Sequence, residues 1–324
     1  MRDNLSVVIS AYNEEDNVRE LYRRVKRAVE ESGLDSAEII FVDDGSSDST
    51  FLLCRELQTE DPAVKIVRLT RNVGHEIAMR AGLDNADADG VLFMDADLQH
   101  PPELIPNMVR LWKDGYDIVL TRRTDNKEET YFHGACSRVF YRVLNFLSDV
   151  EIPQSMPDFR LLDRKYADWL KGFNERDSLF RGTLSMVAAL NRNNVATLDF
   201  VADRRNAGES KYGFRKYLHL ALSGILQFSV RPLHFSLWLS VVFGILACGL
   251  GLYVIVEYFV LKQPTPGYAT IVTTVVFMGS MNLFVLAIVG TYIGKIHQET
   301  KKRPLYFADV FPGKRERDGK NNQR

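Results

Sequence analysis

Short apolar runs alternate with stretches of helical spacing in the first third of the chain, and this alternation is the strongest constraint on its fold. The runs "SVVIS", "EIIFV" and "VLFM" are almost continuously apolar, as in strands buried on both faces. Strands that alternate with helices form a mostly parallel α/β sheet with helices on both faces. We therefore predict strands at residues 5–10, 38–42, 64–69, 91–94 and 117–120, and helices at 15–32, 49–57, 77–85 and 103–113.

Clusters of polar residues follow the predicted strands. They read "YNEE", "DDGSSDS", "DADLQ" and "TRR". The carboxyl ends of parallel strands meet at one edge of a sheet, which is where ligands bind in α/β proteins. The sequence therefore predicts a binding site at this edge.

Two aspartates, Asp95 and Asp97, come directly after a predicted strand in "VLFMDADLQHPPE". Alternate residues of an extended chain face the same side, about 6–7 Å apart. Two carboxylates so placed repel each other unless a cation lies between them. A cation site is one interpretation. The other is a solvated turn before the next helix, because Pro101, Pro102 and Glu103 resemble a helix start.

A second acidic pair, Asp43 and Asp44, opens "DDGSSDS" at the end of another predicted strand. The chain has no P-loop motif, and carboxylates repel phosphate, but they accept hydrogen bonds from a ribose hydroxyl or a base N–H. A tight turn that caps the helix at Ser49 is the alternative, and both can hold. If Asp43 binds a nucleoside, its diphosphate requires Mg²⁺ or Mn²⁺ between it and the nearby carboxylates.

Two long runs without charge, Phe235–Val256 and Tyr268–Gly294, predict two transmembrane helices, since about 20 apolar residues cross a bilayer. A buried helical hairpin is the alternative. Residues 204–232 and 295–324 each carry a net charge of +5 against −1 for the whole chain. These basic segments flank the two spans, which predicts a cytoplasmic body, cytoplasmic termini and a short external loop. Outside these two segments the chain is acidic, which does not suggest a nucleic-acid partner.

Four segments follow from these patterns. We expect a catalytic domain at residues 1–203, a basic loop and amphipathic helix at 204–233, the two spans at 234–294, and a basic tail at 295–324. The amphipathic stretch at 211–233 leads into a span, which favours an interfacial location. A similar stretch at 132–150 is equally compatible with packing on the sheet.

The chain resembles the family 2 (GT-A fold) glycosyltransferases over nearly its full length. The resemblance rests on "DDGSSD", "DADLQHPPE", "RRNAGESKY" and the final "GTYIGKIHQETKKRPLY". It is to the polyisoprenyl-phosphate branch, which includes bactoprenol glucosyltransferases, aminoarabinose-lipid transferases and dolichol-phosphate mannose synthases. Two spans fit the bactoprenol type best. The family further implies an inner-membrane location and a homo-oligomer, a tetramer in membrane-anchored relatives.

The resemblance implies roles on the donor side of the reaction. Residues that would line the nucleotide pocket are Tyr12, Asn13, Glu14, Asp43 and Asp44. Residues that would hold Mg²⁺ or Mn²⁺ on the diphosphate are Asp95, Asp97 and Gln99. Phosphate-binding residues with a catalytic role would be Arg205 and Lys211.

The resemblance also implies roles on the acceptor side. Arg122 and Ser137 would meet the acceptor phosphate, and Asp158 takes the position of a catalytic base. Relatives often carry Arg where this chain has His133, and Arg138 could substitute for it. Asp158 could instead pair with Arg160 or Arg164 to hold a loop. His75 and His100 lie near the expected site, but a lone histidine is more often structural, so neither enters the expected catalytic set.

The expected reaction is an inverting, metal-dependent transfer of a hexose from a sugar nucleotide to a polyprenyl phosphate. UDP-glucose and undecaprenyl phosphate are the best match, and GDP-mannose or a UDP-aminosugar are alternative donors. A processive polysaccharide synthase is disfavoured because no QxxRW motif is found. A non-catalytic membrane protein that binds sugar nucleotides is the remaining alternative.

Overall fold

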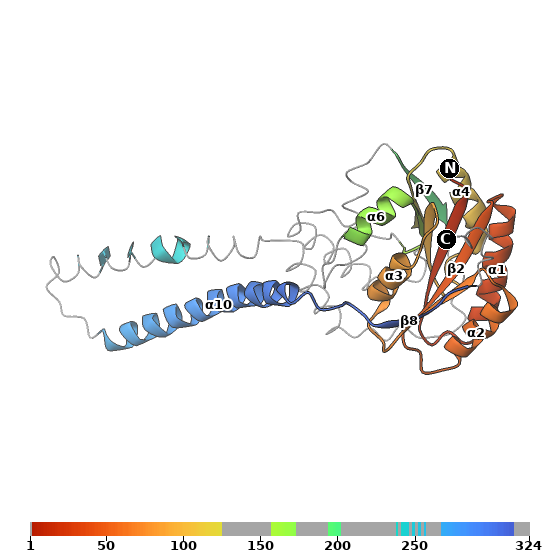
Figure 1. Cartoon of the computed structure of the whole chain (residues 1–324). Coiled ribbons are helices and arrows are strands. Elements are labelled where there is room, and N and C mark those ends of the chain that lie inside the picture. Colours follow the sequence, from red (N-terminus) through yellow and green to blue (C-terminus); the bar gives the residue numbers. More distant parts are fainter. Residues whose placement is uncertain are drawn as a thin grey trace, which may run out of the picture. The chain divides into compact units, whose positions relative to one another are not determined.

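The protein is built around one eight-stranded mixed sheet (Figure 1). The computed structural model describes residues 2–124, 157–172, 194–201 and 267–313, with scattered positions between 238 and 256. The described strands are β1 (Asn4–Ala11), β2 (Ser36–Asp43), β3 (Val64–Leu69), β4 (Gly90–Asp95), β5 (Ile118–Arg123), β6 (Arg160–Asp163), β7 (Val195–Phe200) and β8 (Ala308–Phe311).

Helices connect most of these strands. They are α1 (Val18–Glu31), α2 (Thr50–Glu60), α3 (His75–Asp84), the short 3₁₀ turn η1 (Pro102–Leu104), α4 (Ile105–Lys113), α6 (Arg164–Gly172) and α10 (Tyr268–Thr300). The predicted strands and helices of the first 120 residues all occur, with shifts of a few residues at their ends.

The strand order is β7-β5-β6-β4-β1-β2-β3-β8. β1 pairs in parallel with β2 and β4, β2 with β3, and β5 with β7. β6 runs antiparallel between β4 and β5, and β8 runs antiparallel beside β3. The mostly parallel α/β sheet predicted from the sequence is therefore present. Three strands that the sequence pattern did not indicate complete it: the parallel strand β7 and the antiparallel strands β6 and β8.

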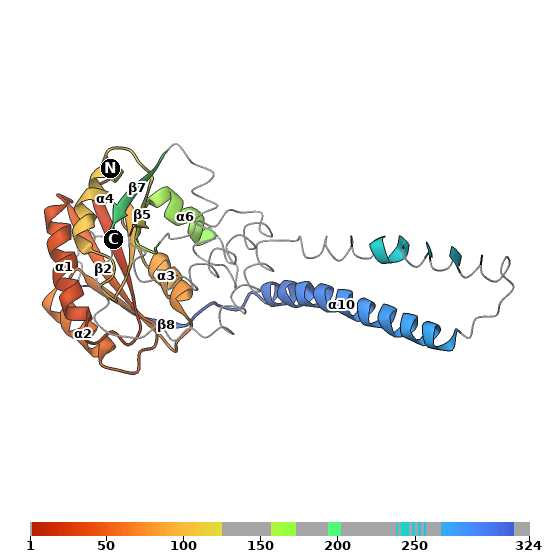
Figure 2. The ribbon, with the colours of Figure 1, turned by 180° about the vertical axis from the view of Figure 1, so that it is seen from behind.

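Both faces of the sheet are covered, which explains the continuous apolar runs. In β2, Ile39 and Phe41 join the core beneath α1, α2 and α4, whereas Ile40 and Val42 join the core beneath α3 and α6. Successive strand residues face opposite sides, so a strand buried on both sides needs apolar residues throughout. Figures 1 and 2 show α1 and α2 on one side of the sheet and α3 and α6 on the other.

Helix α3 approaches the sheet closely at Gly82. A Cβ added there would lie 2.2 Å from Val8 Cγ1 and 3.0 Å from Val42 Cγ2. Only glycine allows this contact. The close contact fixes the depth of α3 on the sheet, and with it the position of His75 at the first turn of the helix.

The apolar helix α10 spans 33 residues and contains the second predicted span. Its segment Phe277–Thr300 is long and apolar enough to cross a membrane, and none of its most apolar window is buried. It is the one such helix in the described part of the chain. Half of the first predicted span, residues 235–256, lies outside the described residues. The structure therefore supports one span by length and composition.

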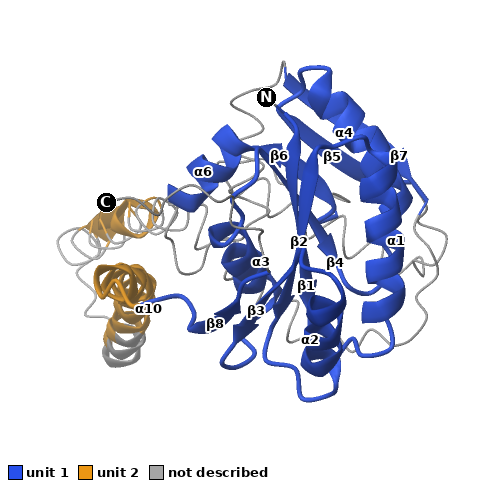
Figure 3. Cartoon of the chain, turned by 45° about the vertical axis from the view of Figure 1, so that its right-hand side comes forward, with its two compact units in different colours: residues 1–141, 150–212, 304–324 blue, residues 142–149, 213–303 orange. Residues whose placement is uncertain are grey.

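The chain divides into two compact units (Figure 3). One comprises residues 1–141, 150–212 and 304–324, and the other comprises residues 142–149 and 213–303. The tail beyond α10 thus belongs to the unit that contains the sheet, to which it contributes β8. The predicted amphipathic stretches at 132–150 and 211–233 lie outside the described residues.

Candidate active site

The polar clusters of the sequence gather at the carboxyl ends of β1, β2 and β4. The strand register pairs Ala11 of β1 with Asp43 of β2, and Ser10 of β1 with Asp95 of β4. The chain leaves all three strands at the same edge of the sheet. The segments that follow them are therefore neighbours, as expected for the binding edge of a parallel sheet.

Asp95, Asp97 and Gln99 form a row on one side of the chain after β4. All three are partly exposed, whereas the intervening Ala96, Leu98 and His100 are buried. The chain bends in this segment: Asp97 Oδ1 accepts a hydrogen bond from the backbone N–H of Gln99 at 3.1 Å, across Leu98 with its positive φ of 60°. The side chains of Asp95 and Asp97 are both partly exposed, although the chain is not extended as the sequence analysis assumed.

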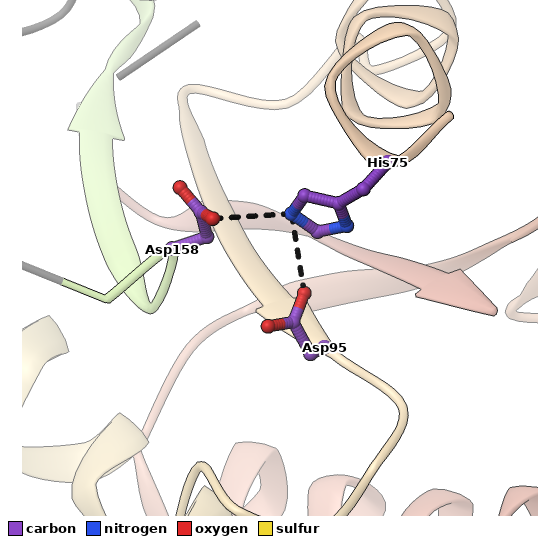
Figure 4. A group of neighbouring side chains, drawn as sticks. All are labelled: His75, Asp95 and Asp158. Atoms are coloured by element: carbon purple, nitrogen blue, oxygen red, sulfur yellow. Dashed lines mark hydrogen bonds and ion pairs between the residues drawn. The ribbon is translucent and has the colours of Figure 1, made fainter. Parts of the chain in front are cut away.

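His75 lies between two carboxylates that come from distant parts of the chain (Figure 4). Its Nε2 is 3.1 Å from Asp158 Oδ2 and 3.4 Å from Asp95 Oδ1. Its Nδ1 is 2.8 Å from Ser10 Oγ. The first residue of α3, the end of β4 and the segment before β6 thus meet at one imidazole.

These contacts define the charge of His75. Carboxylates only accept hydrogen bonds, so Nε2 carries a hydrogen. Ser10 Oγ donates to Asp95 Oδ1 at 3.5 Å, which leaves Nδ1 to donate to Ser10. Burial opposes a charge on the ring, but the hydrogen bond to Asp158 and the negative charges of Asp95 and Asp158 raise the pKa of His75 to about 9. His75 is therefore an imidazolium at neutral pH.

Each carboxylate oxygen of Asp158 has a charged partner. It is 1% exposed, and its Oδ1 forms an ion pair with Arg160, which is 3% exposed. Its Oδ2 faces His75. Of the two partners considered from the sequence, Arg160 is the one observed, while Arg164 pairs with Asp168 instead. Both oxygens of Asp158 are engaged, which is the geometry of an oriented anion rather than of an open base.

Asp44 fixes the turn that leads into His75. Its Oδ1 accepts from the Val73 N–H at 2.8 Å and its Oδ2 from the Gly74 N–H at 3.0 Å. Burial raises the pKa of Asp44 above its ordinary value, although these two N–H groups oppose the shift. A Cβ on the neighbouring Gly45 would lie 2.6 Å from the backbone of Arg71, so the two loops pack with no room for a side chain.

Asp43 is completely buried at the end of β2. Its Oδ1 accepts from the Ser46 N–H at 3.0 Å, which is the turn considered from the sequence. Its Oδ2 lies 3.5 Å from Arg68 Nε and has no hydrogen-bond partner among the described residues. A buried acceptor without a hydrogen bond is unfavourable, and Arg68 is the charged group placed to compensate it.

Asn13 and Glu14 join the loop after β1 to the start of α2. Asn13, with a positive φ of 56°, donates its backbone N–H to Ser46 Oγ, and its side-chain oxygen accepts from the Ser47 N–H at 2.9 Å. The backbone N–H of Glu14 donates to Thr50 Oγ1 at 2.8 Å. Tyr12 is 46% exposed beside them. Asn13 and Glu14 thus shape this edge of the sheet, and the ring of Tyr12 is open to solvent.

The acceptor-side residues are only partly described. Arg122 forms a two-pronged ion pair with Asp199 on the adjacent strand β7, at 2.7 and 2.9 Å, and both side chains are exposed. Ser137, Arg138, Arg205 and Lys211 lie outside the described residues.

The row after β4 fits a hard cation. Two carboxylates and an amide oxygen are the ligands that Mg²⁺ and Mn²⁺ prefer. The described part of the chain also brings ligand atoms of His75, Asp95 and Asp158 within 4.8 Å of one another. A metal-binding histidine is neutral, so His75 would have to lose a proton to act as a ligand. Asp95 belongs to both groups of candidate ligands.

The sequence analysis left His75 out of the expected catalytic set and did not consider Ser10. His75 follows the turn "RNVG" after the third strand, and that turn leaves the sheet at the same edge as the acidic loops. Its place after a strand was a usable signal. His100, also left out of the expected catalytic set, is buried, stacks on Phe159 with ring centroids 5.4 Å apart, and accepts the Asp95 N–H at Nδ1.

A mostly parallel α/β sheet with acidic loops at one edge defines the class of fold, and comparison with known proteins gives the family. The glycosyl transferase family 2 model matches residues 6–170. The chain therefore belongs to glycosyl transferase family 2, and it is a glycosyltransferase.

Relatives match nearly the whole chain. A bactoprenol glucosyl transferase of Shigella phage SfX is 34% identical over 303 residues, which cover 94% of this chain and 98% of the relative. A prophage bactoprenol glucosyl transferase homolog of Escherichia coli is 33% identical, with 94% and 97% covered. An uncharacterised glycosyltransferase of Bacillus subtilis is 38% identical, with 95% and 94% covered.

Solved structures with a similar fold include glucosyl-3-phosphoglycerate synthase from Mycobacterium tuberculosis in complex with Mn²⁺ and UDP-glucose. Its TM-score is 0.47 at 18% identity, with 69% of this chain and 77% of that chain covered. S. aureus TarS 1-349 with UDP-GlcNAc has a TM-score of 0.46 at 18% identity, with 72% and 69% covered.

Proposed function

We propose that this glycosyltransferase moves a hexose from a nucleoside diphosphate sugar to a polyprenyl phosphate, and that the product is a polyprenyl-phosphate sugar. The observation that carries the proposal is the row of Asp95, Asp97 and Gln99 beside the charged cluster of His75, Asp158 and Arg160. The row of Asp95, Asp97 and Gln99 suits a diphosphate with its metal, and the cluster around His75 suits an anionic acceptor.

The donor nucleoside would bind over the loops after β1 and β2. Tyr12 offers an exposed ring, and Asp43 has a buried oxygen that lacks a hydrogen bond among the described residues. Asp44 would contribute indirectly, because both of its oxygens already hold the turn before His75. Asn13 and Glu14 would shape this pocket through the loop contacts that they make.

Asp95, Asp97 and Gln99 would hold Mg²⁺ or Mn²⁺ on the diphosphate. The metal would neutralise the charge that develops on the departing nucleoside diphosphate. Arg205 and Lys211, in the basic segment, would add positive charge at the same phosphates.

The acceptor side needs charge compensation more than a base. A phosphate monoester has its second pKa near about 6 and is largely ionised at neutral pH. His75 and Arg160 balance the charges of Asp95 and Asp158. A second anion can therefore approach without facing uncompensated carboxylates. We propose that Asp158 orients the acceptor, with Arg122, Ser137 and Arg138 as candidate phosphate contacts.

The membrane would supply the lipid acceptor. Helix α10, with its apolar segment Phe277–Thr300, supports a membrane anchor. We propose that residues 235–256 form a second span and that 211–233 lies at the interface. The catalytic domain and both termini would then be on the cytoplasmic side of the inner membrane. The relatives named as bactoprenol glucosyl transferases support a bactoprenol acceptor and a glucosyl group as the group transferred. We propose undecaprenyl phosphate as the acceptor and UDP-glucose as the donor. A homo-oligomer stays a prediction from the family.

A transfer assay in detergent tests the proposal. Purified full-length protein is incubated with undecaprenyl phosphate and one of several labelled sugar nucleotides, including UDP-glucose, GDP-mannose and a UDP-aminosugar, with Mn²⁺ or with EDTA. We expect label to enter the lipid phase from one donor, and EDTA to abolish this transfer. Absence of transfer from every donor, in protein that remains folded, would contradict the proposal.

A further inference from the structure

The tail segment, residues 304–313, returns from α10 to the sheet and becomes its edge. β8 pairs antiparallel with β3, with Ala308 opposite Leu69 and Phe311 opposite Ile66. Gln58 donates from Nε2 to the carbonyl of Phe311 at 2.8 Å. A Cβ on Gly313 would lie 2.3 Å from the carbonyl oxygen of Pro62. The segment is therefore fitted closely to its own sheet.

Phe311 begins a line of ring and charge contacts. Its ring centroid lies 5.6 Å from that of Phe51 in α2. The guanidinium of Arg68 lies 4.0 Å from the centroid of the Phe51 ring, on the side of the sheet that α2 covers. Arg68 is thus held by an aromatic face that in turn packs on the tail segment.

Arg68 links this line to Asp43. The sheet register pairs Arg68 of β3 with Asp43 of β2 on one side and with Asp309 of β8 on the other. Arg68 Nε lies 3.5 Å from Asp43 Oδ2, the oxygen that lacks a hydrogen bond among the described residues. Asp43 is completely buried, so it depends on Arg68 for charge compensation within the protein.

We propose that the tail segment is a positioning element of the nucleotide pocket: Phe311 supports Phe51, Phe51 holds Arg68, and Arg68 orients and stabilises the carboxylate of Asp43. This inference rests on the proposed role of Asp43 in nucleotide binding. Because coupling between two sites is reciprocal, bound nucleotide must also stabilise the docked tail.

The test uses the full-length protein in detergent, with UDP and GDP in the presence of Mg²⁺ as probes for calorimetric titration. In Phe51→Leu, which keeps an apolar side chain but removes the ring face, we expect the Kd of the nucleotide to rise roughly 3- to 10-fold, the scale of one lost cation–π contact. Phe311→Ala should have a similar effect. Val310→Ala is the matched control, because Val310 is the neighbouring residue of β8 and is 44% exposed.

A kinetic readout separates positioning from general damage. The substitutions should raise KM for the sugar nucleotide and leave KM for the lipid acceptor unchanged. Hydrogen exchange of the unmodified protein gives a second measurement that needs no variant: nucleotide should slow exchange of the amides of residues 308–311.

Three outcomes decide the matter. A selective loss of nucleotide affinity in Phe51→Leu and Phe311→Ala, with slowed exchange in the tail, supports the inference. Wild-type affinity in both folded variants, or unchanged tail exchange on nucleotide binding, overturns it and leaves the proposed function intact. Failure of the wild-type protein to bind either nucleotide overturns the proposed function and this inference together.

Discussion

His75 Nε2 donates a hydrogen bond to Asp158 Oδ2 at 3.1 Å, although 83 residues separate the two in the chain. The same nitrogen lies 3.4 Å from Asp95 Oδ1. A single imidazolium therefore connects the end of β4 with the segment before β6. It holds two carboxylates together that would repel each other without it.

Replacement of His75 by Gln should lower kcat for sugar transfer about 100-fold, the lower end of the range for removing one positioned electrostatic group. Gln can donate one hydrogen bond but carries no charge, so it cannot compensate both carboxylates. Steady-state kinetics in detergent measures the effect. His297→Gln, at an exposed position in the last turn of α10, is the control. Equal kcat in the two variants would contradict the role of His75.

The stability of the metal-free protein should depend on pH through His75. Its pKa is about 9 in the folded protein and about 6.5 in an unfolded chain. The contribution of the folded-state contacts is therefore complete below about 6.5 and is lost as the pH rises through about 9. Thermal unfolding between pH 6 and 10 should show a decrease in Tm over this window, and His75→Gln should remove most of that decrease. If His75→Gln shows the same decrease in Tm, the decrease is caused by another titratable group.

Asp97→Asn should abolish metal-stimulated transfer and leave the fold intact. The loss should exceed about 100-fold, because a carboxylate on the row is replaced by a weaker ligand where charge develops. Activity is measured against Mn²⁺ concentration, and circular dichroism reports the fold. Asp114→Asn, on the exposed C-cap of α4, is the matched control. Metal-dependent activity that survives in Asp97→Asn would exclude Asp97 as a ligand.

Asp44→Ala should destabilise the protein by about 2–4 kcal/mol. It leaves the N–H groups of Val73 and Gly74 without their acceptors, at roughly 1–3 kcal/mol for each buried group left unpaired. The turn also holds His75, so activity should fall with stability. Chemical unfolding measures the first effect and the transfer assay the second. A loss below about 0.5 kcal/mol would mean that water replaces the carboxylate.

A chain that ends at residue 303 should fold poorly and aggregate, because it leaves the edge of β3 unpaired. A chain that ends at residue 313 keeps β8 and should remain monodisperse. Size-exclusion chromatography of the two truncated proteins in detergent measures the difference. Equal behaviour of the two would show that β8 is dispensable for the fold.

The sequence was sufficient to predict the strands and helices of the first 120 residues, because their residue patterns depend only on neighbours in the chain. A strand such as β2 is covered on both faces and has apolar residues throughout, and α1 buries the stripe of Val18, Leu21, Val25 and Ala28 on one side. The position of Asp95 and Asp97 at the end of β4 was also predictable, because they directly follow an apolar run.

The sequence did not reveal β6, β8 or the role of His75. Four-residue strands such as β6 and β8 have too few positions to show a pattern. Their partners are distant in the chain, so nothing local indicates the pairing.

The sequence by itself therefore determined the class of the fold, the edge of the sheet at which the acidic loops gather and the family of the enzyme, because local pattern and motif carry that information. Only the tertiary structure decided that Asp158 is held by His75 and Arg160, and that the tail lies beside β3 in contact with Phe51. These contacts arise when the sheet brings remote segments together, and their free energies depend on the burial and charge that the folded chain creates.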